Sequence, residues 1–406
     1  MKKKQMLFDF EMILISFSIA IFTLGYTYFS FFIAGYCALK LKSLKYPAIL
    51  VILFSFVFTS GTLISFWNIL ISKYDSIYTS DILYRIRFFW IRIFFSIGIL
   101  IYVCRLSYQQ ILRFVYYISV PLTIAGLFQF LEAPFERVTM LASEHSAAGM
   151  YYVFMLPLLL EYYKISKKSR FWIILFIILG LFIRSKAQIL VLPLMLLYFV
   201  FKSENKKLKR TVMGIVLVGI VSLPFILRIP QLNSINHFIT VLREYGIGGL
   251  TEKNQIWTSF TLRFSSFLTA VQLFGENLLG TGFGAFHPEY ILKMTSNSVQ
   301  AQMTGIEITG TLKNELYATP KAIFFEYLVS CGLFFLVPII FLIIRFYKSP
   351  VSNLIKASMY SLIIISLMVE LSPFLTFLAI NMMLLYKSTK KNGKHNILHQ
   401  GQTRIE

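Results

Sequence analysis

Charged residues are scarce in this chain. Only 14% of its 406 residues are Asp, Glu, Lys or Arg, while 57% are hydrophobic. Soluble domains carry roughly 25% charged residues, so a soluble fold would have too few of them to cover so much apolar surface. We therefore expect a membrane protein, because apolar stretches of about 20 residues recur throughout the chain.

Acidic residues are scarcer than basic ones: 18 Asp and Glu stand against 39 Lys and Arg, a formal net charge of +21. A nucleic-acid-binding surface would need contiguous basic positions interleaved with stacking aromatics. Instead, most cations fall in short clusters between apolar runs, such as KSENKKLKR at residues 202–210. This distribution predicts cytoplasmic links between membrane spans and no nucleic-acid partner.

Cysteine is also rare. The three cysteines, Cys37, Cys104 and Cys331, lie in or beside apolar runs, and their spacing is not that of a metal site or a disulfide framework. No internal repeat of fixed period is evident, and no low-complexity tract stands out beyond the apolar bias. The sequence therefore gives no sign of a metal, and we expect no cofactor.

The apolar runs fit an all-α polytopic fold of about 12 transmembrane helices, since unpaired backbone is not tolerated in lipid. The start, MKKKQMLFDF, is basic and leads into an apolar run without a clean cleavage site, which predicts an uncleaved first span. With alternating spans, every densely basic link and both termini fall on the cytoplasmic side. The predicted spans cover residues 7–24, 26–39, 47–66, 86–104, 114–131, 147–163, a seventh ending near 183, an eighth ending near 202, 211–227, 322–344 and a final hairpin that turns near 370–373.

One long segment, residues 229–319, would not fit in a bilayer. Its Lys and Arg are nearly balanced by Glu, and it keeps too many aromatic and aliphatic residues to be disordered. Long loops are usually functional, so we expect a folded extracytoplasmic loop that carries part of an active site, with residues 294–312 as a lid. The predicted organisation is 1–228 with nine spans, 229–319 as the large loop, 320–387 with three spans, and 388–406 as a basic cytoplasmic tail.

Several cations fall on the side where the positive-inside rule does not place them. Arg85 and Arg87 lie at the outer end of the fourth predicted span, Arg92 lies deeper, and Arg184 and Lys186 flank an outer turn. A cation inside a span costs roughly 2.5 to 3.5 kcal/mol and usually faces a cavity or a partner, although a long side chain can also reach the headgroup region. Arginine forms paired bonds to phosphate oxygens, so these positions suit an anionic, lipid-linked substrate.

Two histidines and one glycine run have competing interpretations. His145, near the outer end of a span, could act as a base near neutral pH, but a lone histidine, like His287, more often makes a loop hydrogen bond. Gly280, Gly282 and Gly284 superficially resemble a dinucleotide loop, without the strand that such a loop needs. We expect them to allow a tight turn or a close approach to a ligand.

Three stretches occur in a fixed order along the chain. RSKAQILVLPL is an outer turn with its following helix, LRFSSFLTAVQLFGENLLGTGFGAF has an arginine, an apolar helix and Gly-x-Gly-x-Gly-x-Phe, and PKAIFFEYLVSCGLFFLVPII is a returning helix with Gly332. In this order they resemble the bacterial O-antigen polymerase and O-antigen ligase family, the Wzy-type polymerases. The resemblance covers roughly residues 144–344. Ligases of the family typically begin the returning helix with His-Asn, and Lys321 stands there instead, which favours a polymerase.

The resemblance implies a glycosyltransferase that works without nucleotide sugar or metal at the outer face of the bacterial cytoplasmic (inner) membrane. Its substrates would be undecaprenyl-pyrophosphate-linked repeat units, joined into O-antigen, capsular polysaccharide or exopolysaccharide. Expected partners are membrane lipid, a chain-length regulator and a flippase. Two alternatives stay open: a ligase-like glycan transferase, and a polysaccharide flippase or transporter.

The same resemblance supplies most of the candidate site residues. Arg263, Arg184 and Lys186 are candidates for clamping the pyrophosphate, and Glu326 would orient the acceptor or pair with a buried cation. His145 is the remaining catalytic candidate. The candidate substrate-binding residues are Arg87, Arg92, Arg243, Gly280, Gly282, Gly284 and Lys321.

Overall fold

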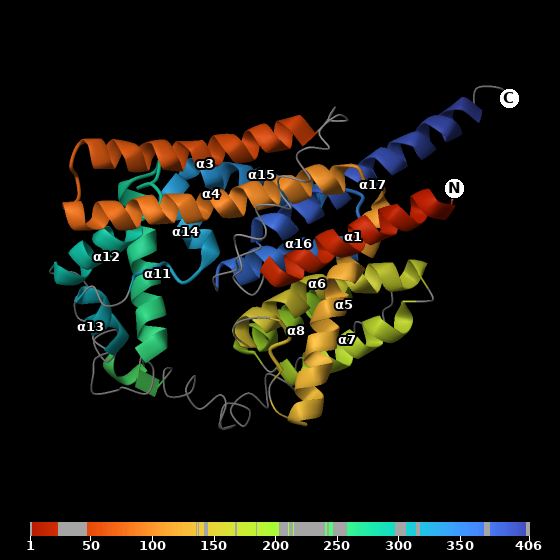
Figure 1. Ribbon diagram of the computed structural model, residues 1–406, viewed down its shortest axis with the longest axis horizontal. Coiled ribbons are helices and arrows are strands. Elements are labelled where there is room, and N and C mark those ends of the chain that lie inside the picture. The colour runs from red at the N-terminus through yellow and green to blue at the C-terminus, as the bar shows by residue number, and fades with distance from the viewer. Residues whose placement is uncertain are drawn as a thin grey trace. The chain divides into compact units, whose positions relative to one another are not determined.

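A computed structural model describes most of the chain (Figure 1). The described residues are 2–22, 47–134, 136, 138–141, 145–166, 169–183, 185–202, 210, 214, 240–241, 243–246, 258–296, 306–313, 317–368 and 374–402. Within these ranges every regular element is a helix, so the all-helical prediction is confirmed for them. The predicted spans at 26–39 and 211–227, apart from residue 214, and the turn at 370–373 lie outside the described residues.

The chain divides into two compact units. The first unit comprises residues 1–56, 87–199 and 337–406, and the second comprises residues 57–86 and 200–336. Four helices have residues in both: α3 (Pro47–Leu70), α4 (Ser76–Cys104), α8 (Lys186–Lys202) and α15 (Leu333–Lys348).

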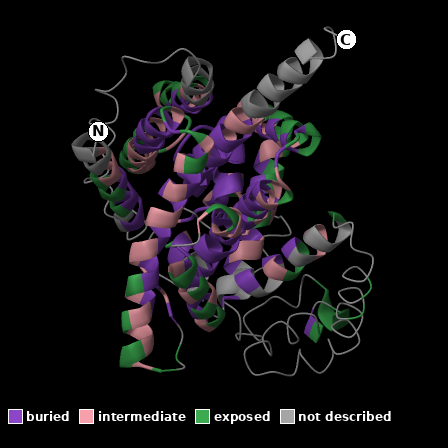
Figure 2. Cartoon of the chain, turned by 90° about the vertical axis from the view of Figure 1, so that its right-hand side faces the viewer, coloured by how far each residue is buried: buried purple, intermediate pink, exposed green. Residues whose placement is uncertain are grey.

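The first unit is a bundle of apolar helices. In it α6 packs against α5, α7 and α16, and α5 also packs against α1, α7 and α17. Buried residues gather along the packed sides of the helices (Figure 2). The helices that belong wholly to this unit are α1 (Lys2–Phe22), α5 (Tyr108–Glu132), α6 (His145–Ile165), α7 (Arg170–Ile183), α16 (Asn353–Ser366) and α17 (Phe374–Gln402).

Small and hydroxyl side chains allow the close packing of this bundle. A Cβ at Gly149 would collide with the Ser185 side chain. The buried Ser358 hydroxyl donates to the Phe154 carbonyl oxygen of the neighbouring helix at 2.8 Å. Interfaces between membrane helices are typically rich in such residues, because they let backbones approach and satisfy polar groups away from water.

The second unit is built around the predicted loop. Its own helices are α11 (Thr258–Glu276), α12 (Phe286–Thr295), α13 (Ile306–Leu312) and α14 (Ile323–Cys331). Helices α11 to α14 enclose a core whose buried members are Leu262, Ala270, Leu273, Phe286, Tyr290, Met294, Ile308, Ala318 and Val329. The described part of the loop is therefore folded. Three residues of the segment predicted as a lid, Met294, Ile308 and Leu312, pack in or against this core.

Three predicted boundaries differ from the structure. The fourth span, predicted to begin at residue 86, begins as α4 at Ser76, so Asp81 lies within this helix. The returning span predicted at residues 322–344 is broken at Gly332, whose φ is 55°, into α14 and α15. At the C-terminus, α17 continues past Lys387 to Gln402, so the predicted tail begins inside a helix.

By length and composition, two helices among the described residues are suited to crossing a membrane: Ser76–Cys104 and Tyr108–Glu132. Shorter apolar helices accompany them, such as Arg170–Ile183 and Asn353–Ser366. Apolar side chains also face outward in rows. On α15 the exposed Val337, Ile340, Phe341 and Ile344 follow helical spacing, so one side of that helix is continuously apolar.

Candidate functional site

The glycine run packs against several helices of the second unit, and we call residues 278–284 the glycine hub. A different helix backbone lies against each of its three alternate glycines, all of which have positive φ. A Cβ at Gly280 would lie 2.6 Å from the Ser330 carbonyl oxygen of α14, and one at Gly282 would lie 2.6 Å from the Ser65 nitrogen of α3. A Cβ at Gly284 would lie 2.8 Å from the Ile82 Cα of α4. Only glycine combines this backbone conformation with such close approach.

Backbone hydrogen bonds join the glycine hub to the break between α14 and α15. The Thr281 N–H donates to the Val329 carbonyl oxygen at 2.7 Å, and the Gly282 N–H donates to that of Ser330 at 3.1 Å. In the opposite sense, the Leu333 N–H donates to the Leu278 carbonyl oxygen at 2.8 Å. The hub thereby satisfies backbone groups that the helix break at Gly332 leaves unpaired, as buried backbone groups require.

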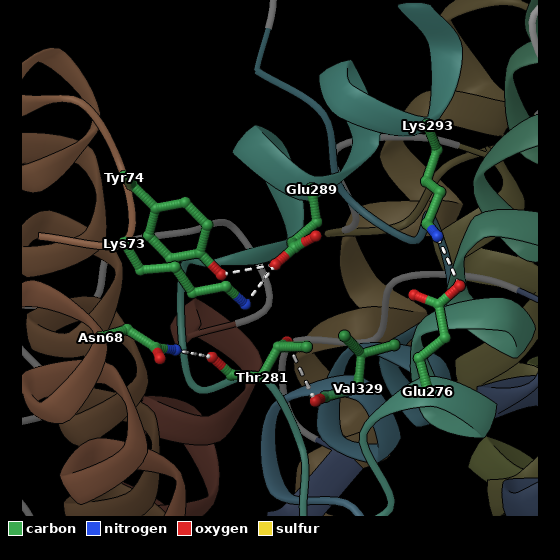
Figure 3. Close-up of polar contacts among 8 residues, drawn as sticks. All are labelled: Asn68, Lys73, Tyr74, Glu276, Thr281, Glu289, Lys293 and Val329. Carbon is green, nitrogen blue, oxygen red and sulfur yellow. Dashed lines mark hydrogen bonds and ion pairs between the residues drawn. The ribbon is translucent and has the colours of Figure 1, made fainter. Parts of the chain in front are cut away.

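Side chains from α3 hold the other side of the hub. The Asn68 amide donates to the Thr281 carbonyl oxygen at 2.8 Å (Figure 3). The Ser65 hydroxyl donates to the Phe283 carbonyl oxygen at 3.0 Å. Both side chains are buried, so these bonds also keep two polar groups of an apolar helix paired.

A buried carboxylate ties the turn after α3 to α12. Glu289, only 8% exposed, accepts from the Lys73 ammonium at 2.6 Å and from the Tyr74 hydroxyl at 2.8 Å (Figure 3). Burial, and then the charge of Glu289, raises the pKa of the Tyr74 phenol, so the hydroxyl keeps the proton that it donates. A second Lys–Glu pair, Lys293 with Glu276, is more exposed at its carboxylate and joins α12 to the end of α11.

Tyr317 connects the end of the hub to the turn before α14. Its hydroxyl donates to the Gly284 carbonyl oxygen at 2.8 Å, and its ring stacks on His287 with ring centroids 4.5 Å apart. The Arg85 guanidinium carbon lies 4.0 Å from the centre of the same ring. Burial raises the pKa of Tyr317, although the neighbouring Arg85 acts to lower it, and the phenol therefore stays neutral.

The buried His287 has a defined tautomer. Its Nδ1 accepts a hydrogen bond from the Ala318 backbone N–H at 3.0 Å, so in the neutral ring the proton is on Nε2. The interpretation of His287 as a loop hydrogen-bonding residue is confirmed by this contact. The ring also receives the edge of Tyr78, with centroids 5.8 Å apart, which fixes its position from the side of α4.

The predicted site residues of the second unit have different surroundings. Gly280, Gly282 and Gly284 approach helices, and this packing accounts for all three without a ligand, so their contact with substrate stays a prediction. Glu326 is 8% exposed, in the first turn of α14, and acts electrostatically on Tyr317. Lys321 is half-buried, with a φ of 56° that is uncommon outside glycine.

For the remaining predicted site residues, the structure gives mainly their burial and their position along a helix. Arg263 is half-buried on α11, and Arg243 is exposed on a short helical segment. In the first unit, Arg87 is exposed, while the half-buried Arg92 lies with its guanidinium carbon 4.0 Å from the centre of the Phe88 ring. His145 and Lys186 are the first residues of α6 and α8, and Arg184 lies outside the described residues. The joint role of Arg263, Arg184 and Lys186 as a pyrophosphate clamp stays a prediction.

The sequence interpretation missed Tyr317, Lys73, Tyr74 and Glu289. Glu289 contacts residues more than 200 positions away, so no local pattern links it to Lys73 or Tyr74. One signal was present for Glu289: it follows the glycine run within HPEY, in a stretch whose residues 281–290 are all buried. A carboxylate in so apolar a stretch indicates a paired charge.

Comparisons of the chain with protein-family models, with curated proteins and with solved structures find no match.

Proposed function

We propose that this chain is a multi-pass membrane glycosyltransferase that joins polyprenyl-pyrophosphate-linked oligosaccharide repeat units into a surface polysaccharide. In this proposal the chain crosses the bacterial cytoplasmic membrane about 12 times, with both termini in the cytoplasm and residues 229–319 outside. The polymer would be O-antigen, capsular polysaccharide or exopolysaccharide.

The membrane setting is supported by the outward rows of apolar side chains. On α7 the exposed Phe171, Ile174, Ile178 and Leu181 repeat the arrangement found on α15. Apolar patches of this kind on soluble monomers are small, and larger ones mark interaction or membrane surfaces. Buried hydroxyls that bond within their own helix, such as Thr62 to the Phe58 carbonyl oxygen at 2.9 Å, also suit membrane helices.

The observation that carries the proposal is the junction between residues 278–284 and 329–333. These segments belong to two of the three stretches in which the chain resembles the polymerase and ligase family, and here they are hydrogen-bonded backbone to backbone. Each glycine of the Gly-x-Gly-x-Gly-x-Phe run has a specific packing reason. The spacing of this run is therefore explained by packing. This supports the proposal that the chain shares the fold of the family that it resembles.

The proposed reaction is a displacement at an anomeric carbon. An acceptor hydroxyl oxygen bonds to the anomeric carbon of the donor sugar, and the bond from that carbon to the pyrophosphate oxygen breaks. The electron pair leaves with the polyprenyl pyrophosphate, and the hydroxyl proton passes to a base, for which the buried Glu326 is the candidate. Arg263, Arg184 and Lys186 are the candidates for stabilising the charge that develops on the leaving pyrophosphate.

Deletion of the gene, followed by gel analysis of surface glycan, tests the proposal. Single repeat units in place of a ladder are expected, and complementation with the wild-type gene should restore the ladder. Polymer that is fully extended but not attached would indicate a ligase-like transferase instead. An unchanged ladder would exclude both activities in that cell.

A second candidate function, a flippase or transporter, is favoured by one observation. The helix break at Gly332 makes α14 and α15 a discontinuous pair, and such pairs often form binding sites in transporters. Purified protein in liposomes separates the two functions. Elongation of lipid-linked repeat units without translocation supports the polymerase, whereas movement of unextended units across the bilayer supports the transporter.

A further inference from the structure

One face of α4 presents hydrogen-bonding and aromatic side chains next to the glycine hub. Tyr78, Asp81 and Arg85 are spaced by three and four residues, so they share this face. Tyr78 contacts His287, and Arg85 contacts Tyr317. Tyr78, Asp81, Arg85 and Tyr317 are all half-buried. The face is therefore anchored to the protein and still partly open to solvent.

The donors and acceptors of this face are not fully used by the protein. The Arg85 guanidinium lies over the Tyr317 ring and acts to lower the pKa of its phenol, so most of its five N–H groups remain for other partners. Among the described residues, none forms an ion pair with Arg85. Two carboxyl groups, Asp81 and Glu326, are close enough to Tyr317 to act on its phenol electrostatically.

The combination of one guanidinium with two carboxyl groups discriminates between ligands. A phosphate would bond to Arg85 but would be repelled by Asp81 and Glu326. For a metal, the described residues hold no suitable group of three His, Cys, Asp or Glu side chains. A sugar hydroxyl can accept from the guanidinium and donate to a carboxylate at once, and Tyr78 offers an amphipathic ring beside them.

We propose that Tyr78, Asp81, Arg85 and Tyr317, with Glu326 behind them, form a binding subsite for an uncharged sugar. The subsite rests on the proposed function in one respect: the sugar would belong to the acceptor repeat unit, placed beside Glu326. It also restricts the substrate class, since a uronic acid or a phosphorylated sugar would meet two carboxyl groups here.

Direct binding to the purified full-length protein in detergent tests the subsite without any activity measurement. The probe is the free repeat-unit oligosaccharide, released by mild acid from the lipid-linked pool of the source cells, and inorganic pyrophosphate is the competitor. Arg85→Lys and Asp81→Asn are each expected to weaken oligosaccharide binding by about tenfold, as expected when a charge-assisted hydrogen bond is lost. Pyrophosphate should not displace the oligosaccharide from the wild-type protein.

Glu276→Gln is the matched control, because it changes an exposed carboxylate of the same unit and should leave binding unchanged. Thermal unfolding of every variant shows whether it is folded. If Arg85→Lys does not fold, Asp81→Asn still tests the subsite, because it preserves the shape of a half-buried side chain. Displacement by pyrophosphate, or wild-type binding by both folded variants, would overturn the subsite.

The gel analysis separates this outcome from that of the proposed function. If deletion of the gene abolishes the ladder but both variants bind the oligosaccharide as the wild type does, the subsite is wrong and the polymerase proposal stands. An unchanged ladder, together with oligosaccharide binding that needs Arg85 and Asp81, removes the polymerase and leaves a carbohydrate-binding site.

Discussion

The two units of this chain satisfy the hydrogen bonds of their buried backbone and polar groups in different ways. In the first unit, long helices satisfy their own backbone, and side chains make most contacts between helices, as when the Ser358 hydroxyl donates to the Phe154 carbonyl oxygen. In the second, the backbone itself leaves helical geometry and pairs across the hub, as Thr281 does with Val329. The first arrangement tolerates local change at each contact. The second depends on a few positions at once, and such rigid, irregular centres commonly support functional sites.

The largest effect is expected at the hub. Gly282→Val adds a side chain at a φ of 90°, against the Ser65 backbone, so strain and overpacking together should lower the free energy of unfolding by roughly 3 to 5 kcal/mol. Gly275→Ala is the control, because it has open space within α11, and it should raise stability by up to about 1 kcal/mol. Thermal unfolding in detergent measures both. Equal unfolding temperatures for Gly282→Val and wild type would show that the close packing at Gly282 does not stabilise the second unit.

The next effect concerns the two Lys–Glu pairs of the second unit. Glu289→Ala removes a buried acceptor of two hydrogen bonds and should cost about 2 to 3 kcal/mol, reduced because the Lys73 side chain is 37% exposed. Glu276→Ala removes an exposed carboxylate and should cost less than about 1 kcal/mol. Unfolding at two salt concentrations checks the assignment, since salt screens the exposed pair more strongly. If both variants lost a similar free energy of unfolding, burial of the carboxylate would not determine how much each Lys–Glu pair stabilises the protein.

A smaller effect is expected in the first unit, where side chains meet. Gly149→Ala should cost about 1 to 2 kcal/mol, because its methyl group meets the Ser185 side chain. Ser185→Gly alone should cost only a few tenths of a kcal/mol at this helix start, and it removes the clash. The double variant should therefore unfold close to Ser185→Gly. If the double variant instead lost the sum of both costs, the predicted contact would be absent.

The smallest effect at neutral pH is expected at Tyr290, whose hydroxyl is 2.7 Å from that of Ser265 in the loop core. Tyr290→Phe should cost about 1 kcal/mol there, since Ser265 keeps a second bond to the Leu262 carbonyl oxygen. Burial raises the pKa of Tyr290 from 10.0 to about 12. The folded state thus holds the phenolic proton more tightly than the unfolded state does, and this contribution to stability is complete below pH 10 and lost as the pH rises through 12.

Unfolding temperatures of wild type and Tyr290→Phe, measured from pH 7 to pH 12, test this dependence. The wild type should lose its advantage in the alkaline range while the variant declines less. A constant difference across the range would show that Tyr290 is as accessible to solvent in the folded protein as in the unfolded one.

Much of the helix framework could be predicted from the sequence because apolar run length is a strong signal. The start of α3 at Pro47 and the end of α7 at Ile183 agree with their predictions. The break at Gly332 could not be predicted, since a glycine within an apolar run is also common inside membrane helices. The break is favourable because a distant segment, residues 278–282, forms backbone hydrogen bonds with Val329, Ser330 and Leu333.

The candidate site was predicted in part. The resemblance singled out Glu326, and the glycine spacing singled out the glycine run. The run forms the hub, and Glu326 lies on α14, whose C-terminal residues are hydrogen-bonded to the hub. Tyr317 was not singled out, because an aromatic residue in an apolar chain carries no distinguishing signal until its partners Arg85 and His287 are known. Arg85 itself was expected at the outer end of a span, either near an anionic substrate or with its side chain reaching the headgroup region.

The bonds from Ser65 and Asn68 to the hub have a consequence for the order of events during synthesis. Asn68 and its partner Thr281 are 213 residues apart. At a translation rate of about 5 to 20 residues per second, Thr281 is synthesised roughly 10 to 40 seconds after Asn68. During that interval the Asn68 amide must bond to water or to another chain. We therefore expect the second unit to stay incompletely folded on the nascent chain until residue 333 is made. In the first unit, contacts between helices that are neighbours in sequence, such as α5 with α6, can form earlier.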